Sequence, residues 1–100
     1  MKFWYFKFEG EFTKGSPEYG YHGVISSCFI PESNYQKARA IFMRALEGNE
    51  IKLVEILEHF SVDGEELDPK DKDNKFWIKW YKEAKKKKAP VFDKWHVFNE

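Results

Sequence analysis

The sequence predicts one small α+β domain, because stretches with strand-like alternation and stretches with helical spacing follow one another along its 100 residues. Apolar residues make up 42% of the chain and charged residues 34%, which is typical of a globular protein and not of a disordered one. Aromatic residues reach 19%. Because each buried ring removes roughly 150–250 Å² from water, a few rings supply most of a small core and others are left for the surface.

The N-terminal third of the chain predicts two strands. Residues 4–12 alternate with the period of two that marks a strand with one buried face, and the apolar positions are Trp4, Phe6, Phe8 and Phe12. Gly10 suits a bulge or a bend in this strand. Residues 21–30 form the second strand, which has apolar residues on both faces. We expect the two strands to pair antiparallel, because neighbours in sequence usually neighbour in space.

A helix and a third strand are predicted in the middle of the chain. Ser33 suits the N-cap of a helix, apolar residues recur at helical spacing over residues 35–46, and Gly48 ends the helix. Residues 51–60 fit a strand through their β-branched side chains and a helix through the spacing of their leucines. The strand is favoured because a helix has just ended. Residues 62–73 form a polar, acidic loop.

The C-terminal part predicts a second helix and a fourth strand. Capping residues at 71–74 precede a broad aromatic helix face, which consists of Phe76, Trp77, Trp80 and Tyr81. Pro90 ends this helix, and residues 91–98 alternate as a strand. The order β-β-α-β-α-β predicts one domain over residues 1–100, with an antiparallel or mixed four-stranded sheet and two helices packed on one face, loosely ferredoxin-like. An edge strand at 4–12 or 91–98 could pair with a second copy in a homodimer.

Charge is distributed unevenly although the net charge is zero. Residues 1–46 carry a net charge of +2, residues 47–73 carry −7 and residues 74–100 carry +5. The single cysteine, Cys28, cannot form an internal disulfide, which predicts a reducing compartment. No segment resembles a signal peptide or approaches the roughly 18 apolar residues of a membrane span. We therefore expect a cytoplasmic protein with no membrane partner.

Residues that could support catalysis or metal binding do not form a known pattern. Cys28 lies at an apolar strand end, where a free cysteine is usually inert. The histidines lie on three separate strand candidates without metal-ligand spacing, as His22, His59 and His96. Phosphate-binding glycine motifs are also missing from the sequence. We expect no enzyme, no cofactor and no metal. An enzyme or small-molecule site around His22, Cys28 or His96 is the weakest of three hypotheses.

Binding of another protein accounts for most of the unusual features. Protein interfaces favour aromatic residues at their centres, and the second helix carries more aromatic residues than one buried stripe requires. An acidic loop beside those rings suits a basic partner. The residues expected to bind such a partner are Glu65, Glu66, Asp68, Asp71, Trp77 and Tyr81. Small cytoplasmic proteins with such acidic surfaces include inhibitors and immunity proteins. By analogy of size and charge, we expect a non-catalytic interaction domain, such as an inhibitor, immunity or regulatory protein.

Binding of single-stranded nucleic acid is the alternative. Aromatic residues on a sheet can stack unpaired bases, and clustered lysines can neutralise phosphates. On this hypothesis Phe3 and Tyr5 form the stacking surface, and the phosphate contacts come from Lys82, Lys85, Lys86, Lys87 and Lys88. The zero net charge and the lack of an RNA-recognition signature weigh against it. The lysines also suit the C-terminus of a helix for purely local reasons.

Overall fold

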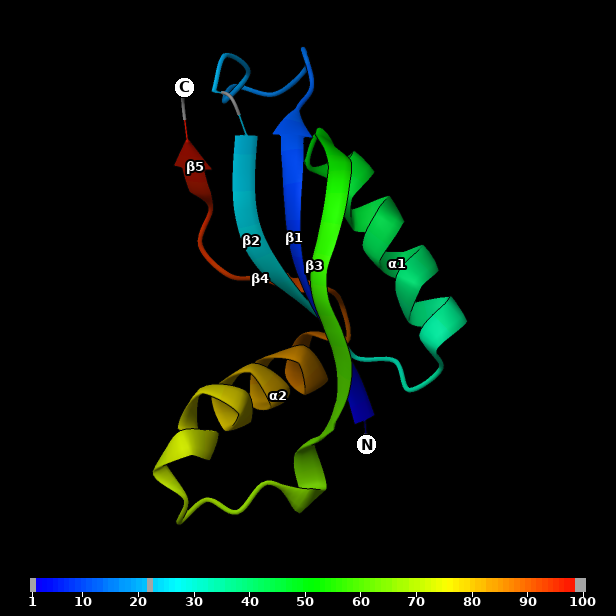
Figure 1. The fold of residues 1–100 in the computed structure, drawn as a ribbon. Coiled ribbons are helices and arrows are strands. Elements are labelled where there is room, and N and C mark those ends of the chain that lie inside the picture. The colour runs from blue at the N-terminus through cyan, green and yellow to red at the C-terminus, as the bar shows by residue number, and fades with distance from the viewer. Residues whose placement is uncertain (1, 22, 99–100) are drawn as a thin grey trace.

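The structure, a computed structural model, describes residues 2–21 and 23–98. Its strands and helices follow one another along the chain as Figure 1 shows. In order they are β1 (Lys2–Phe12), β2 (Gly23–Ile30), α1 (Tyr35–Gly48), β3 (Ile51–Asp63), the short 3₁₀ helices η1 (Gly64–Glu66) and η2 (Lys72–Asn74), α2 (Lys75–Lys87), β4 (Val91–Phe92) and β5 (His96–Phe98). The predicted small α+β domain with an antiparallel sheet and two helices is confirmed.

β1 lies in the middle of the sheet. It pairs antiparallel with β2 on one side and with β3 on the other, and β4 and β5 both pair antiparallel with the far side of β2. Of the two segments expected to supply an edge strand, residues 4–12 are therefore central. The expected strand at 91–98 does lie at an edge, but it is divided into β4 and β5. Between them the buried Ser26 hydroxyl donates to the carbonyl oxygens of Asp93 and Lys94, at 3.2 and 3.0 Å.

The two helices cover opposite faces of the sheet, so the prediction that both pack on one face is wrong. Alternate residues of β1 point to opposite faces. Phe6 and Phe8 belong to the core under α1, whereas Phe3 and Tyr5 belong to the core under α2. Figure 1 accordingly shows α1 and α2 on different sides of the strands. β1 is thus buried on both faces over its first half.

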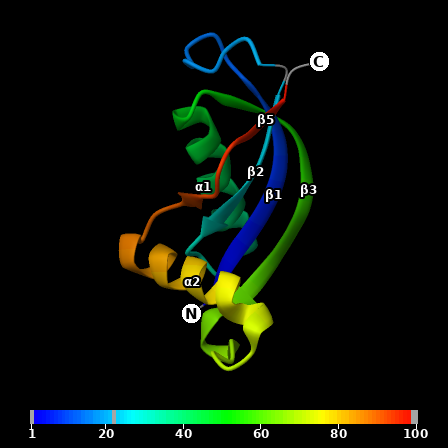
Figure 2. The ribbon, with the colours of Figure 1, turned by 90° about the vertical axis from the view of Figure 1, so that its left-hand side faces the viewer.

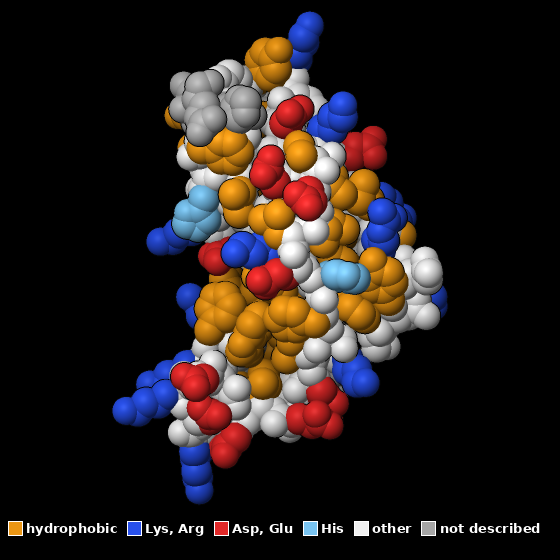
Figure 3. All heavy atoms as spheres, in the orientation of Figure 1, with side chains coloured by type: hydrophobic (Ala, Val, Ile, Leu, Met, Phe, Trp, Pro, Cys, Tyr) orange, Lys and Arg blue, Asp and Glu red, His pale blue; other side chains and the backbone are white. Residues whose placement is uncertain are grey.

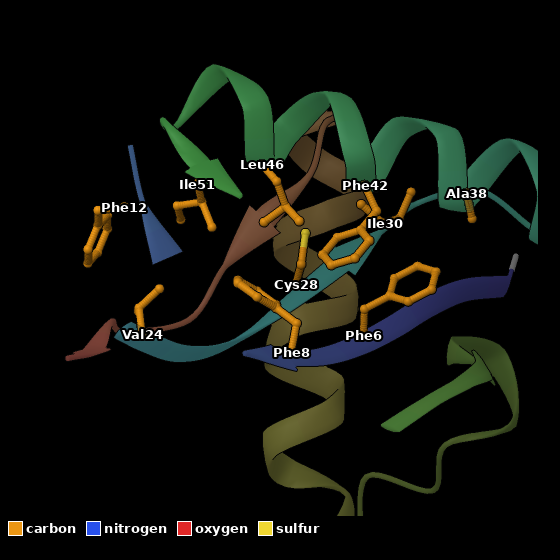
Figure 4. Packing of buried hydrophobic residues seen from close by; sticks show 10 residues of the cluster. All are labelled: Phe6, Phe8, Phe12, Val24, Cys28, Ile30, Ala38, Phe42, Leu46 and Ile51. Atoms are coloured by element: carbon orange, nitrogen blue, oxygen red, sulfur yellow. The ribbon is translucent and has the colours of Figure 1, made fainter. Parts of the chain in front are cut away.

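The first core lies between α1 and the sheet. Phe6 of β1 stacks on Phe42 of α1 with 4.6 Å between the ring centroids and 7° between the ring planes. Figure 4 shows Phe6, Phe8 and Cys28 pointing from the strands towards the helix. α1 ends as predicted at Gly48, but its N-cap is Asn34 and not Ser33. The Asn34 side chain accepts a hydrogen bond from the Lys37 N–H at 3.0 Å, the usual geometry of an N-cap.

The second core lies between α2 and the N-terminal half of β1. Its centre is Phe29 of β2, which stacks on Trp80 of α2 with 4.7 Å between the centroids and 5° between the planes. Phe3 and Tyr5 lie beside Phe29, with centroid distances of 5.9 and 5.3 Å. Aromatic contacts therefore hold α2 against the strands.

β3 is a long strand that follows β1 along its whole length. The strand prediction for residues 51–60 is confirmed, and the strand continues to Asp63. The pairing of β1 with β3 shifts register twice, so that Val54 and Leu57 are extra residues in β3. Gly10 lies at one shift, where a Cβ atom would approach Ile51 Cγ2 to 2.5 Å. The predicted irregularity at Gly10 is confirmed, and the close approach of Ile51 explains why glycine stands at this position.

Phe42→Ala should lower the free energy of unfolding by roughly 3–5 kcal/mol, because it empties the space against Phe6 at the centre of the first core. The matched variant is Met43→Ala, at the next position of α1, where the side chain is exposed. Urea denaturation followed by circular dichroism measures both. A loss of similar size in the two variants would contradict the assignment of Phe42 to the core.

Candidate functional site

A groove of about 500 Å³ lies where the end of β3 meets η1 and the start of α2. The groove combines apolar and polar side chains, and its lining consists of Phe60, Ser61, Val62, Asp63, Glu66, Leu67, Asn74 and Trp77. Glu66 and Trp77 were both expected to bind a partner, and the structure brings them to the same groove. The fold thus places part of the acidic loop beside the aromatic helix face, as the sequence indicated.

The aromatic rings that line the groove are Phe60 and Trp77, and both rest on the ring of Tyr5 beneath them. Phe60 lies opposite Tyr5 in the pairing of β3 with β1, and the two ring centroids are 4.9 Å apart. Trp77 of α2 packs edge-on against both rings, at 5.1 Å from Tyr5 and 5.4 Å from Phe60. Tyr5 is buried beneath them, whereas Phe60 keeps 39% of its surface exposed. The aromatic contacts therefore fix an exposed ring at the mouth of the groove.

Phe76 extends this apolar surface along α2. Its ring is 45% exposed and lies 5.1 Å from the ring of Trp77. Figure 3 shows apolar side chains gathered over α2 beside β3, with acidic side chains above and below them. The expectation that some rings of the second helix reach the surface is confirmed. Sequence reasoning named Trp77 but missed Phe60, whose exposure depends on β3 being an edge strand.

The acidic loop is held in place by its own aspartates. Asp63, Asp68 and Asp71 each accept a hydrogen bond from the backbone N–H two residues further on, at 3.1, 2.9 and 3.0 Å. These are Asx turns, which shape the loop locally. Asp68 and Asp71 therefore help to form the loop, while Glu65 and Glu66 follow the first turn on η1 with exposed side chains.

Tyr81 anchors the loop to α2. Gly64 at the start of η1 lies against the Tyr81 ring so closely that a Cβ atom at this position would overlap it. Tyr81 is half-buried and its ring lies 5.8 Å from that of Phe3 in the second core. It does not line the groove among the described residues. The structure therefore gives Tyr81 a positioning role next to the predicted site.

The outer side of β3 is open. Among residues 2–21 and 23–98, no strand pairs with the side of β3 that faces away from β1. Figure 2 shows β3 at the margin of the molecule, with no helix beyond it. Val54 is 50% and Leu57 39% exposed on this strand. The sequence did not reveal this surface, because nothing local in residues 51–63 indicates whether a strand is central or at an edge.

Charged pairs cross β1 and β3 on the sheet face away from α1. Lys7 lies opposite Glu58, and Glu11 lies opposite Lys52, so both of these pairs join opposite charges. Between them Glu9 lies directly opposite Glu55. Like charges directly opposite one another on neighbouring strands destabilise a sheet. The chain therefore keeps an unfavourable pair of carboxylates beside its open edge.

The proposed base-stacking surface is not available. Phe3 is 1% and Tyr5 8% exposed, because α2 covers this part of the sheet, so their expected exposure is corrected. The lysines of that hypothesis lie at the surface on or just after the C-terminal half of α2, and they are Lys82, Lys85, Lys86, Lys87 and Lys88. Lys87 is 3.0 Å from the carboxylate of Glu83. The structure thus separates the lysines from any open ring of β1.

Cys28, His59 and His96, the described residues considered for catalysis, do not come together. Cys28 is completely buried, and this burial raises the pKa of its thiol, which keeps it protonated at neutral pH. His59 lies on β3 and His96 on β5, with β1 and β2 between them, and His22 lies outside the described residues. Within residues 2–21 and 23–98, no group of three or more His, Cys, Asp and Glu side chains is placed to hold a metal ion.

In the same part of the chain neither helix is long and apolar enough to cross a membrane.

The chain was also compared with known proteins. No model of a protein family, no curated protein and no solved structure matches it. The expected ferredoxin-like arrangement thus has no support from a related structure.

Glu55→Lys should raise the free energy of unfolding by about 0.5 kcal/mol, because it replaces the repulsion from Glu9 with an attraction. Glu58→Lys should lower it by a similar amount, since the introduced lysine would lie opposite Lys7. Urea denaturation at low salt measures both, and the two effects should shrink in 0.5 M salt. Equal effects of the two variants would contradict the observed register.

Cys28 should react with a thiol reagent at pH 8 only as fast as the protein unfolds. The unfolded thiol ionises around its ordinary pKa of 9.0, whereas the folded thiol, with its raised pKa, stays protonated. As the pH rises above 9.0, this difference should therefore lower the free energy of unfolding by about 1.4 kcal/mol per pH unit. Denaturation of the wild type and of Cys28→Ala isolates the effect, since the variant lacks this slope. Rapid labelling of the folded protein would show that the thiol is accessible.

Proposed function

We propose that this chain is a non-catalytic protein-interaction domain that binds its partner at the groove between β3, η1 and α2. The observation that carries the proposal is the pair of exposed rings, Phe60 and Phe76, on either side of Trp77. Interfaces place aromatic residues at a central apolar patch and surround it with a polar rim. Here the rim is acidic, because Asp63 and Glu66 line the same groove.

A basic protein is the partner that this surface fits best. Residues 47–73, which contain β3 and the acidic loop, carry a net charge of −7. A surface of one sign attracts an oppositely charged partner and speeds its association, and the attraction weakens as salt is added. An inhibitor, immunity or regulatory protein of the cytoplasm that blocks a basic partner is the form of this function consistent with the size and the charge of the chain.

The nucleic-acid alternative keeps one favourable observation, the exposed lysines at the end of α2. The rings expected to stack the bases, Phe3 and Tyr5, are buried. Binding through the lysines alone would be electrostatic and without base stacking. The experiment below separates it from protein binding.

Phe60→Ser combined with Phe76→Ser should reduce partner capture at least about tenfold, because a hot spot of two aromatic residues contributes roughly 2 kcal/mol or more in typical interfaces. Tagged protein is used to capture partners from lysate with and without nuclease treatment, and recovery is quantified by mass spectrometry. The matched control is Tyr19→Ser with Tyr21→Ser, which removes two exposed rings from the loop between β1 and β2. Circular dichroism confirms that each variant is folded.

A partner that survives nuclease and is lost only with the groove variant supports the proposal. Equal capture by the wild type and the groove variant would show that the groove is not the binding site. Capture that disappears with nuclease, and with replacement of Lys85 to Lys88 by Gln, would transfer the function to nucleic acid. Glu66→Gln with Asp68→Asn should weaken capture less than the aromatic variant does, because exposed rim charges contribute little to affinity.

A further inference from the structure

We infer that the partner adds an extended, basic strand to the open edge of β3. The inference rests on the proposed function and specifies its binding mode. β3 is paired with β1 on one side, while its other side offers backbone N–H and C=O groups to solvent. Addition of a strand to such an edge is a common way of binding an extended peptide. The end of β3 leads directly into the groove, because Phe60 to Asp63 belong to both.

The open edge lacks a proline and a covering helix, and the bulges at Val54 and Leu57 are the edge-protecting feature that it keeps. Exposed edges are commonly blocked by proline, by lysine or by a covering helix. Within Ile51–Asp63 there is no proline, and Lys52 near its start is the only lysine or arginine. The side chains from 57 to 60 are all exposed, so no described segment covers this part of the strand. The length and exposure of β3 therefore leave room for a further strand.

The side chains of β3 determine which residues an added strand should carry. Glu55 and Glu58 both lie on the open face, because the extra residue Leu57 shifts the register between them. Side chains of an added strand on this face lie beside these carboxylates, where Lys or Arg is favoured. On the other face the neighbours are Leu53 and Ile56, which are half-buried against the first core. Alternate basic and apolar residues therefore fit the edge.

The like-charge pair of Glu9 and Glu55 supports the same partner. A basic residue on the far side of Glu55 completes a row of three side chains across the sheet and offsets the repulsion between the two carboxylates. A second copy of this chain provides no such charge. Each β3 carries one lysine against Glu55, Glu58 and Asp63, so two copies would bring a net charge of −2 from each strand together. Charge complementarity thus favours a basic segment of another protein over self-pairing.

The test uses three fluorescent synthetic peptides of eight residues. The first alternates Lys and Val, the second alternates Glu and Val, and the third is the Lys–Val peptide with every backbone nitrogen methylated. We expect the first to bind, the second to show no binding, and the third to bind at least tenfold more weakly, because it keeps the charges but cannot donate backbone hydrogen bonds. Fluorescence anisotropy gives the three affinities. Hydrogen exchange should show added protection of amides in Ile51–Asp63 when the first peptide is bound.

Charge-matched variants test the role of the carboxylates. Glu55→Gln with Glu58→Gln should weaken binding of the Lys–Val peptide at least fivefold at low salt. The control, Glu18→Gln with Glu83→Gln, changes the net charge equally at positions off β3 and should leave the affinity within twofold. An equal loss of affinity in this variant and in the control would mean that binding depends only on the net charge of the protein. That result would overturn the inference.

The remaining outcomes separate this inference from the proposed function. Equal binding of the methylated and unmethylated peptides would rule out strand addition. Sedimentation that reveals a dimer with protected β3 amides would make a second copy the occupant and overturn the basic segment. If no peptide binds while lysate capture still depends on Phe60 and Phe76, the binding mode is wrong and the proposed function stands. If capture is independent of both rings but the Lys–Val peptide binds β3, the groove proposal fails and the edge inference stands.

Discussion

The fold depends on the burial of β1 on both of its faces. Phe6 and Phe8 pack under α1, and Phe3 and Tyr5 pack under α2, because successive residues of a strand point in opposite directions. The backbone N–H and C=O groups of a strand buried in this way need hydrogen-bond partners. β2 and β3 provide them on the two sides of β1. Aromatic residues on both faces of the first half of β1 thus account for a central strand with one helix on each face.

The candidate site follows from this arrangement. Once β1 is central and β2 accepts the C-terminal strands, β3 is left with one unpaired side. α2 covers only the start of the face opposite α1, so Lys7, Glu9 and Glu11 further along β1 stay on an open surface. The aromatic groove forms where α2 stops covering the sheet. There Phe60 and Trp77 extend the second core to the surface. The proposed binding surface is therefore the exposed margin of the second core.

Local pattern predicted the elements of this fold better than their arrangement. The helix with Trp77 and Trp80 and the strand at 51–60 could be identified because alternation and helical spacing act over short distances. Strand order could not be derived, because pairing joins residues far apart in sequence. The same limit explains the site. The proximity of the acidic loop to Trp77 was foreseen, since the loop precedes the helix directly, but the exposure of Phe60 and the burial of Phe3 depend on which strand lies at the edge and which face α2 covers.

Two features of β3 are unfavourable for the isolated chain, and both lie on the same strand. Val54 and Leu57 expose apolar surface beside unpaired backbone groups, which invites aggregation. Glu55 repels Glu9 across the sheet. A small domain could tolerate the loss of stability from either feature alone. Together they are complementary to one kind of partner, since an extended basic strand pairs the backbone, covers the apolar side chains and neutralises the carboxylates. Local sequence choices that oppose stability are expected where a surface is kept for binding, so their coincidence on β3 favours a functional edge.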